Sequence, residues 1–230
     1  MMITLANLPM WCMDHPYLYL SYVVIIGATM GSFLNVVRYR LPKMLHHLWY
    51  QECQNYLKHH NDQDGQAGIS LMLPRSYCPS CRKTITAQYN IPILSYIFLR
   101  GKCAYCNAHI SWHYPLVELL AALSSCGLAY YFGPTLTCAC SLVLLYILIA
   151  IAAIDCEHHL IPDELNFMLI WFGLVVSIVH VWCSSTEAIL GAIIGYTTFA
   201  LLATAFTKVT KKTGLGGGDW KLLAGIGACL

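Results

Sequence analysis

The feature that most constrains this chain is the absence of any Lys or Arg between residues 103 and 207. Four apolar stretches fill that region, at 116–133, 138–154, 165–183 and 187–206, and a fifth lies at 17–37. Each is close to the twenty or so residues that cross a hydrocarbon core as a helix. With 58% hydrophobic and 10% charged residues, the chain is too apolar for a soluble domain. The sequence predicts an all-α polytopic membrane protein with about five complete transmembrane helices.

The positions of the basic residues predict the topology. Nine of the thirteen Lys and Arg residues lie between residues 38 and 102, and the other four lie at or beyond residue 208. Because basic loops stay in the cytoplasm, both regions are expected on that side. Four predicted helices separate the two regions, and an even number of crossings returns the chain to the same side, which agrees with the charge distribution. The predicted divisions are a periplasmic N-terminus with the first helix (1–37), a cytoplasmic insert (38–115) and a membrane domain (116–230).

Two features of the insert carry structural predictions. Apolar residues at helical spacing over 41–60 predict an amphipathic helix near the membrane surface. Farther along, two C-x2-C motifs are expected to bring four thiolates to one tetrahedral zinc ion in this reducing compartment. The alternatives are reduced cysteines without a metal, or iron on the same ligands. The four expected ligands are Cys78, Cys81, Cys103 and Cys106.

Two aspartates are candidates for chemistry. Asp155 ends the third apolar stretch, and Asp219 follows a glycine run before another apolar segment. Both are expected at the cytoplasmic ends of their segments, where paired carboxylates can act as acid and base in peptide hydrolysis. The alternatives are ordinary helix-end residues or the proton sites of a transporter. The glycines would let backbone approach an extended substrate closely.

Two further acidic residues receive structural interpretations. Asp163 is expected to cap the fourth helix rather than react. Glu118 enters the second apolar stretch and could form an interfacial hydrogen bond or orient a substrate or methyl donor.

Four ordered motifs resemble the type 4 prepilin peptidases. They are Gly-Ser-Phe-Leu-Asn-Val-Val at 31–37 with Tyr-Arg-Leu-Pro at 39–42, the double C-x2-C frame, Ile-Asp at 154–155 with Ile-Pro-Asp-Glu-Leu at 161–165, and Gly-Gly-Gly-Asp at 216–219. The resemblance implies catalytic roles for Asp155 and Asp219, and it supports zinc binding by the four cysteines.

The implied activity is that of an enzyme of the bacterial inner membrane whose active site faces the cytoplasm. Such an enzyme removes the leader of type IV prepilins and pseudopilins, then methylates the new N-terminus with S-adenosylmethionine. Its partners would be these substrates and the lipid bilayer, with no nucleic acid. No nucleotide-binding fingerprint identifies the methyl-donor residues.

The resemblance also implies further helices beyond residue 230. As a helix, residues 220–230 would rise only about 16 Å, so they are expected to form a partial sixth helix that anchors Asp219 poorly. The alternative function is therefore a catalytically impaired remnant that binds prepilins without cleaving them.

Overall fold

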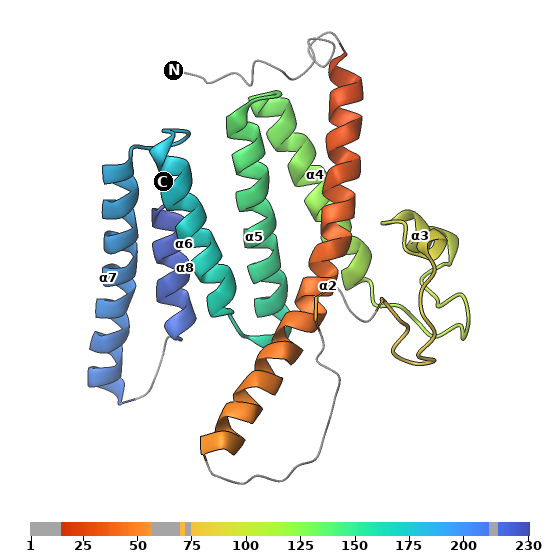
Figure 1. Cartoon of the computed structure of the whole chain (residues 1–230), viewed down its shortest axis with the longest axis horizontal. Coiled ribbons are helices and arrows are strands. Elements are labelled where there is room, and N and C mark those ends of the chain that lie inside the picture. Colours follow the sequence, from red (N-terminus) through yellow and green to blue (C-terminus); the bar gives the residue numbers. More distant parts are fainter. Residues whose placement is uncertain (1–14, 57–69, 72–74, 212–215) are drawn as a thin grey trace. The chain divides into compact units, whose positions relative to one another are not determined.

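A computed structural model of the chain describes residues 15–56, 70–71, 75–211 and 216–230. These residues form helices and connecting turns, with two isolated β-bridges and no strand among them, so the all-α prediction is confirmed (Figure 1). The helices are α2 (Pro16–Tyr56), the 3-10 turn η1 (Ala87–Tyr89), α3 (Leu94–Phe98), α4 (His113–Phe132), α5 (Leu136–His158), α6 (Asp163–Ile178), α7 (Ser185–Thr210) and α8 (Gly217–Gly227).

Four helices in the described part, α2, α4, α5 and α7, are long and apolar enough to cross a membrane. The fourth predicted stretch forms α6, whose 16 residues rise about 24 Å, short for a ~30 Å hydrocarbon core. It ends five residues before the predicted boundary of 183, at Ile178. The chain is thus a multi-pass membrane protein.

The outer faces of the helices are apolar. α7 shows this best, because only 6% of its most apolar 18-residue stretch is buried within the protein. In water such a surface would be strongly unfavourable, whereas lipid solvates it well. The large exposed side chains of α7 include Ile189, Leu190, Ile193, Ile194, Leu201 and Leu202.

The first helix is longer than predicted. α2 runs for 41 residues without interruption, so the helix expected over 41–60 is confirmed for its described part, and residues 41–56 form it as a continuation of the first helix. Residues 57–60 lie outside the described ranges. Pro42 lies inside α2, where it removes the hydrogen bond to Arg38 and bends the helix. Figure 1 shows this bend.

The chain divides into two compact units. One contains residues 22–124, with most of α2, the two C-x2-C motifs, α3 and the first part of α4. The other contains residues 125–230 and the chain up to residue 21; here α5 packs on α6, and α8 packs on both α6 and α7. The three-part division by topology stays a prediction.

Glycines seat α8 closely against its neighbours. A Cβ atom on Gly191 of α7 would overlap the backbone carbonyl of Gly227, and one on Gly195 would lie 2.6 Å from the carbonyl oxygen of Leu223. On α6, a Cβ on Gly173 would lie 2.8 Å from the sulfur of Cys229. Small residues at i and i+4 allow such backbone approach in membranes. The expected poor anchoring of Asp219 is therefore wrong, because close helix packing holds α8.

A Gly191→Ala substitution should destabilise the protein by about 1–3 kcal/mol, since the added methyl group meets rigid backbone. Gly127→Ala is the matched control, because nothing lies within 4 Å of a Cβ added at Gly127 on α4. Denaturation in detergent, followed by circular dichroism, measures both. Equal stability of the two variants would contradict the close packing of α7 and α8.

Candidate functional site

The two C-x2-C motifs fold into matching knuckles. In the first, the Cys78 amide donates to Lys83 O (3.0 Å), and the Arg82 amide donates to Cys78 O (2.8 Å). In the second, Cys103 bonds Ala108 (2.8 Å) and Asn107 bonds Cys103 (3.0 Å) in the same pattern. The fifth residue of each knuckle has positive φ, 57° at Arg82 and 56° at Asn107. Each knuckle is closed by a β-bridge, Tyr77 to Thr84 and Lys102 to His109.

The knuckles bring the four predicted cysteines together. Their sulfur atoms all lie within 4.8 Å of one another, and the Cys78 and Cys106 sulfurs are 3.8 Å apart. A tetrahedral zinc ion with Zn–S bonds of about 2.3 Å requires sulfur–sulfur separations of about 3.8 Å. The donor set and its dimensions therefore fit a structural zinc site, and none of the described cysteines forms a disulfide.

The polypeptide around the cluster favours thiolate at one position. Backbone N–H groups, first that of Cys81 and then that of Ser80, lower the pKa of Cys78 to about 6. Metal coordination needs the thiolate form, so this arrangement prepares a ligand.

Glu118 holds the segment that carries α3. Its Oε2 accepts a hydrogen bond from the Ile93 amide at 2.7 Å, and the side chain is buried. Of its two sequence interpretations, a hydrogen bond is the one observed, and the role toward substrate or methyl donor stays a prediction. Gly31 permits this arrangement, because a Cβ there would lie 2.6 Å from Glu118 Cα.

Asp155 lies in the last turn of α5. Its carbonyl accepts the amide of His159, a left-handed residue that ends the helix. The side chain is exposed, and it has no hydrogen-bond or ion-pair partner among the residues that the structure describes. The carboxylate is thus free to meet another group at this end of the bundle.

Asp219 lies in the first turn of α8 and is half-buried. Its Oδ2 accepts the amide of Gly216 at 3.0 Å, which stabilises the start of the helix. The glycines before it differ in surroundings: a Cβ on Gly218 would lie 2.9 Å from Ile161 Cβ, whereas one on Gly217 would meet nothing within 4 Å. The glycine run was expected to let backbone approach a substrate closely. At Gly218 the close neighbour is instead Ile161, whereas Gly217 faces open space.

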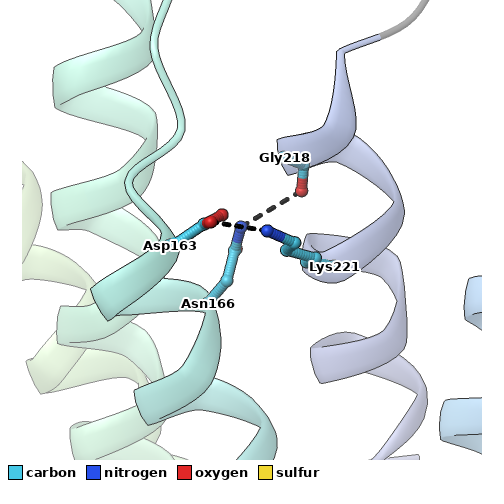
Figure 2. Close-up of polar contacts among 4 residues, drawn as sticks. All are labelled: Asp163, Asn166, Gly218 and Lys221. Atoms are coloured by element: carbon cyan, nitrogen blue, oxygen red, sulfur yellow. Dashed lines mark hydrogen bonds and ion pairs between the residues drawn. The ribbon is translucent and has the colours of Figure 1, made fainter. Parts of the chain in front are cut away.

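The start of α6 is tied to the start of α8 by two polar contacts (Figure 2). Lys221 Nζ lies 2.5 Å from Asp163 Oδ2, and Asn166 Nδ2 donates to Gly218 O at 3.1 Å. Asn166 is fully buried. Asp163 is the first residue of α6, where Pro162 is the N-cap, and it makes no side-chain cap. The predicted capping role is wrong, because the carboxylate points across to Lys221.

These contacts bring one end of the bundle into register. The C-terminal end of α5 and the N-terminal ends of α6 and α8 lie at the same end, with α6 and α8 parallel (Figure 1). No hydrogen bond or ion pair joins Asp155 to Asp219 within the described ranges. The sequence analysis did not assign a role to Lys221 or Asn166. Their positions close to the aspartates, two residues after Asp219 and three after Asp163, could have indicated one.

The fold and these sites define a multi-pass membrane protein that combines a four-cysteine module with a helical bundle carrying aspartates at one end. The chain belongs to the type IV leader peptidase family, whose pattern matches residues 142–230. Residues 25–132 match the bacterial peptidase A24 N-terminal domain. Together the two matches cover most of the chain.

Curated relatives agree with this assignment. The chain is 43% identical over 215 residues to a prepilin leader peptidase/N-methyltransferase of Aeromonas hydrophila, covering 94% of this chain and 74% of that relative. Proteins of the same name from Pseudomonas aeruginosa and Neisseria gonorrhoeae are 41% and 40% identical, over 94% and 90% of this chain and 74% and 72% of theirs. No solved structure matches.

Proposed function

We propose that this chain is an aspartic endopeptidase that removes the leader of type IV prepilins and pseudopilins, and that it methylates the new N-terminus with S-adenosylmethionine. The observation that carries the proposal is the joining of the two aspartate motifs. Asn166, which directly follows the first motif, binds Gly218 of the second, and Asp163 of the first motif binds Lys221, two residues after the second. Residues that are 52 and 58 positions apart in the chain are thus in direct contact, and they join the start of α6 to the start of α8.

In this proposal Asp155 and Asp219 are the catalytic pair. One carboxylate takes a proton from water as the water oxygen attacks the scissile carbonyl carbon, and the other, protonated, gives its proton to the leaving amine. Hydrolysis then needs no covalent intermediate. The open space beside Gly217 next to Asp219 gives an extended peptide backbone room to approach.

Asp163 has a positioning role in this proposal. Its Oδ2 is already occupied by the ammonium group of Lys221, two residues after Asp219. The same ammonium group also makes a cation–π contact, since Lys221 Nζ lies 5.7 Å from the Phe167 ring centre. The ion pair and the Asn166 bond hold the first turn of α8, and hence Asp219, against α6.

The four cysteines would hold a structural zinc ion. Bound there, zinc would supply cross-linking of the two knuckles and no reaction chemistry, because four thiolates leave no open coordination position. S-adenosylmethionine would supply the methyl group. The methyltransferase part of the proposal rests on the names of the relatives alone.

The proposal is tested by incubating membranes containing the chain with a prepilin and S-adenosylmethionine. We expect mass spectrometry to show loss of the leader, followed by the added mass of one methyl group on the mature N-terminus. Co-purification of uncut prepilin with the chain, without any cleavage, would instead support the binding remnant.

We further propose that the protein lies in the bacterial inner membrane with both sites facing the cytoplasm. Reporter fusions should read as cytoplasmic at Arg100 and His159, because the cysteine insert is basic and the α5–α6 turn lies an even number of crossings away. A fusion at Ser184 should read as periplasmic. A cytoplasmic signal at Ser184 would show that α6 does not cross the membrane.

A further inference from the structure

The region around the knuckles exposes an apolar ridge that no part of the described chain covers. This ridge consists of Ile91, Leu94, Ile97 and Phe98, which are 48%, 51%, 63% and 81% exposed. Ile91, Leu94 and Phe98 also line an open pocket of about 300 Å³. Large apolar side chains gathered on one exposed surface are typical of a site that contacts a partner or a membrane.

A strained turn at Ile93 immediately precedes α3, the helix that carries most of this ridge. Ile93 has φ 62° and ψ −51°, and the Leu94 amide donates to Pro92 O, which together form a γ-turn of the rare, strained type. A β-branched residue with positive φ persists only where its surroundings enforce it. Glu118 supplies that constraint by accepting the Ile93 amide at 2.7 Å.

The same hydrogen bond sets the level of the ridge along α4. Glu118 is five residues after His113, so α3 begins beside a point about 7.5 Å along α4. At this level α4 exposes Leu116, Leu119 and Leu120, each more than 40% accessible. Since α4 is long and apolar enough to cross a membrane, these exposed leucines are available for contact with lipid. The ridge is thus held beside the first turns of a candidate membrane helix.

The exposed charge of the segment that carries the ridge is of one sign. Between residues 75 and 112 the chain has five Lys and Arg residues and no Asp or Glu. All five are exposed, and two of them, Arg100 and Lys102, follow α3 directly. If the four cysteines bind a divalent cation as thiolates, that cluster would carry two net negative charges, fewer than the five basic residues around it. Trp112, 61% exposed at the start of α4, is the residue type that lies at membrane interfaces.

From these observations we propose that the ridge inserts into the interface of the protein's own bilayer, with Arg100 and Lys102 against anionic lipid headgroups. The level of the ridge, beside the first turns of a candidate membrane span, identifies the bilayer as the occupant, and the one-sided charge identifies anionic lipid. The cysteine module would then be held on the membrane surface, at the level where α4 enters the membrane, and would not project freely into solvent. This proposal is independent of the enzymatic activity.

Site-specific photocrosslinking in lipid nanodiscs tests the proposal. Phe98 is replaced by the photoreactive benzoylphenylalanine, with Leu120 of α4 as the lipid-facing reference and Ser80, exposed in the first knuckle, as the control. With labelled phosphatidylglycerol in the disc, Phe98 should label lipid within about twofold of Leu120 and about tenfold above Ser80, as expected for an interfacial apolar face. Labelling at Phe98 no higher than at Ser80 would overturn the proposal, as would crosslinks from Phe98 to protein alone.

A second arm tests the charges. Arg100→Gln and Lys102→Gln should each reduce Phe98 labelling by up to about fivefold in discs containing phosphatidylglycerol. In phosphatidylcholine discs the same substitutions should have little effect. Zinc content is measured in every variant, so loss of labelling with zinc retained reports on the membrane contact and not on unfolding. Equal labelling in both lipids and in both variants would overturn the role of anionic headgroups.

Discussion

Asp155→Asn and Asp219→Asn are each expected to reduce prepilin leader cleavage by at least about 10³-fold, while leaving the protein folded in the membrane. An amide keeps the size and hydrogen-bonding capacity of the side chain but can neither hold nor release the proton that hydrolysis requires. Because acid and base act as one unit, losing either should remove most of the rate. The measurement is the initial rate of leader loss by mass spectrometry.

Two neighbouring carboxylates provide controls for this prediction. Glu164, exposed in the first turn of α6, should tolerate a change to Gln with near-normal cleavage. Asp163→Asn should be mild, within about tenfold, because the Lys221 ion pair is partly solvent-exposed and such pairs contribute at most about 1 kcal/mol. Normal cleavage by the Asp219→Asn variant would refute the proposed pair, and an inactive Asp163→Asn variant would transfer the catalytic role to Asp163.

Cys78→Ser is expected to release zinc and unfold the region around the knuckles. Apparent binding free energies of structural zinc in small peptides are about 10–16 kcal/mol at neutral pH, so one lost ligand should remove much of the stability of a region with little core. The wild-type protein, purified in detergent, should contain about one zinc per chain by elemental mass spectrometry. Trypsin should cut the variant rapidly at Arg82, Lys83, Arg100 and Lys102, which are exposed in the folded region.

Cys53→Ser is the matched control, because Cys53 is exposed on α2 and does not belong to the cluster. It should retain zinc and trypsin resistance. Less than half an equivalent of zinc in the wild-type protein, with its thiols reduced, would reject the metal site. An excess of iron over zinc would keep the four ligands and change the metal.

Much of this architecture was predictable, because hydrocarbon leaves the backbone few options. Apolar stretches without charge must satisfy their peptide groups internally, so the predicted ranges and the observed α4, α5, α6 and α7 differ by only a few residues at most ends. The two knuckles were equally predictable, since the C-x2-C spacing places both sulfurs of each pair in one turn. The cluster of Cys78, Cys81, Cys103 and Cys106 confirms that reasoning.

Other features depended on contacts between distant segments. A proline inside a helix often ends it, yet α2 continues through Pro42 with the neighbouring Arg38, Arg40 and Leu41 buried. Arg38 stacks over the Tyr114 ring at 5.1 Å, a contact with a residue of α4. The anchoring of α8 likewise follows from Gly191 and Gly195, whose role depends on which helix lies opposite.

The sequence by itself determined the membrane environment, the helices and the four cysteines of the cluster, because hydrophobic length, charge and cysteine spacing are local properties. Only the tertiary structure decided their partners. Asp163 is a residue type that often caps helices, and α6 begins there. Its carboxylate bonds to Lys221 instead, because α8 packs parallel to α6. Glu118 met Ile93 for the same reason: a hydrogen bond forms where packing of remote segments places the donor, and local periodicity carries no information about that placement.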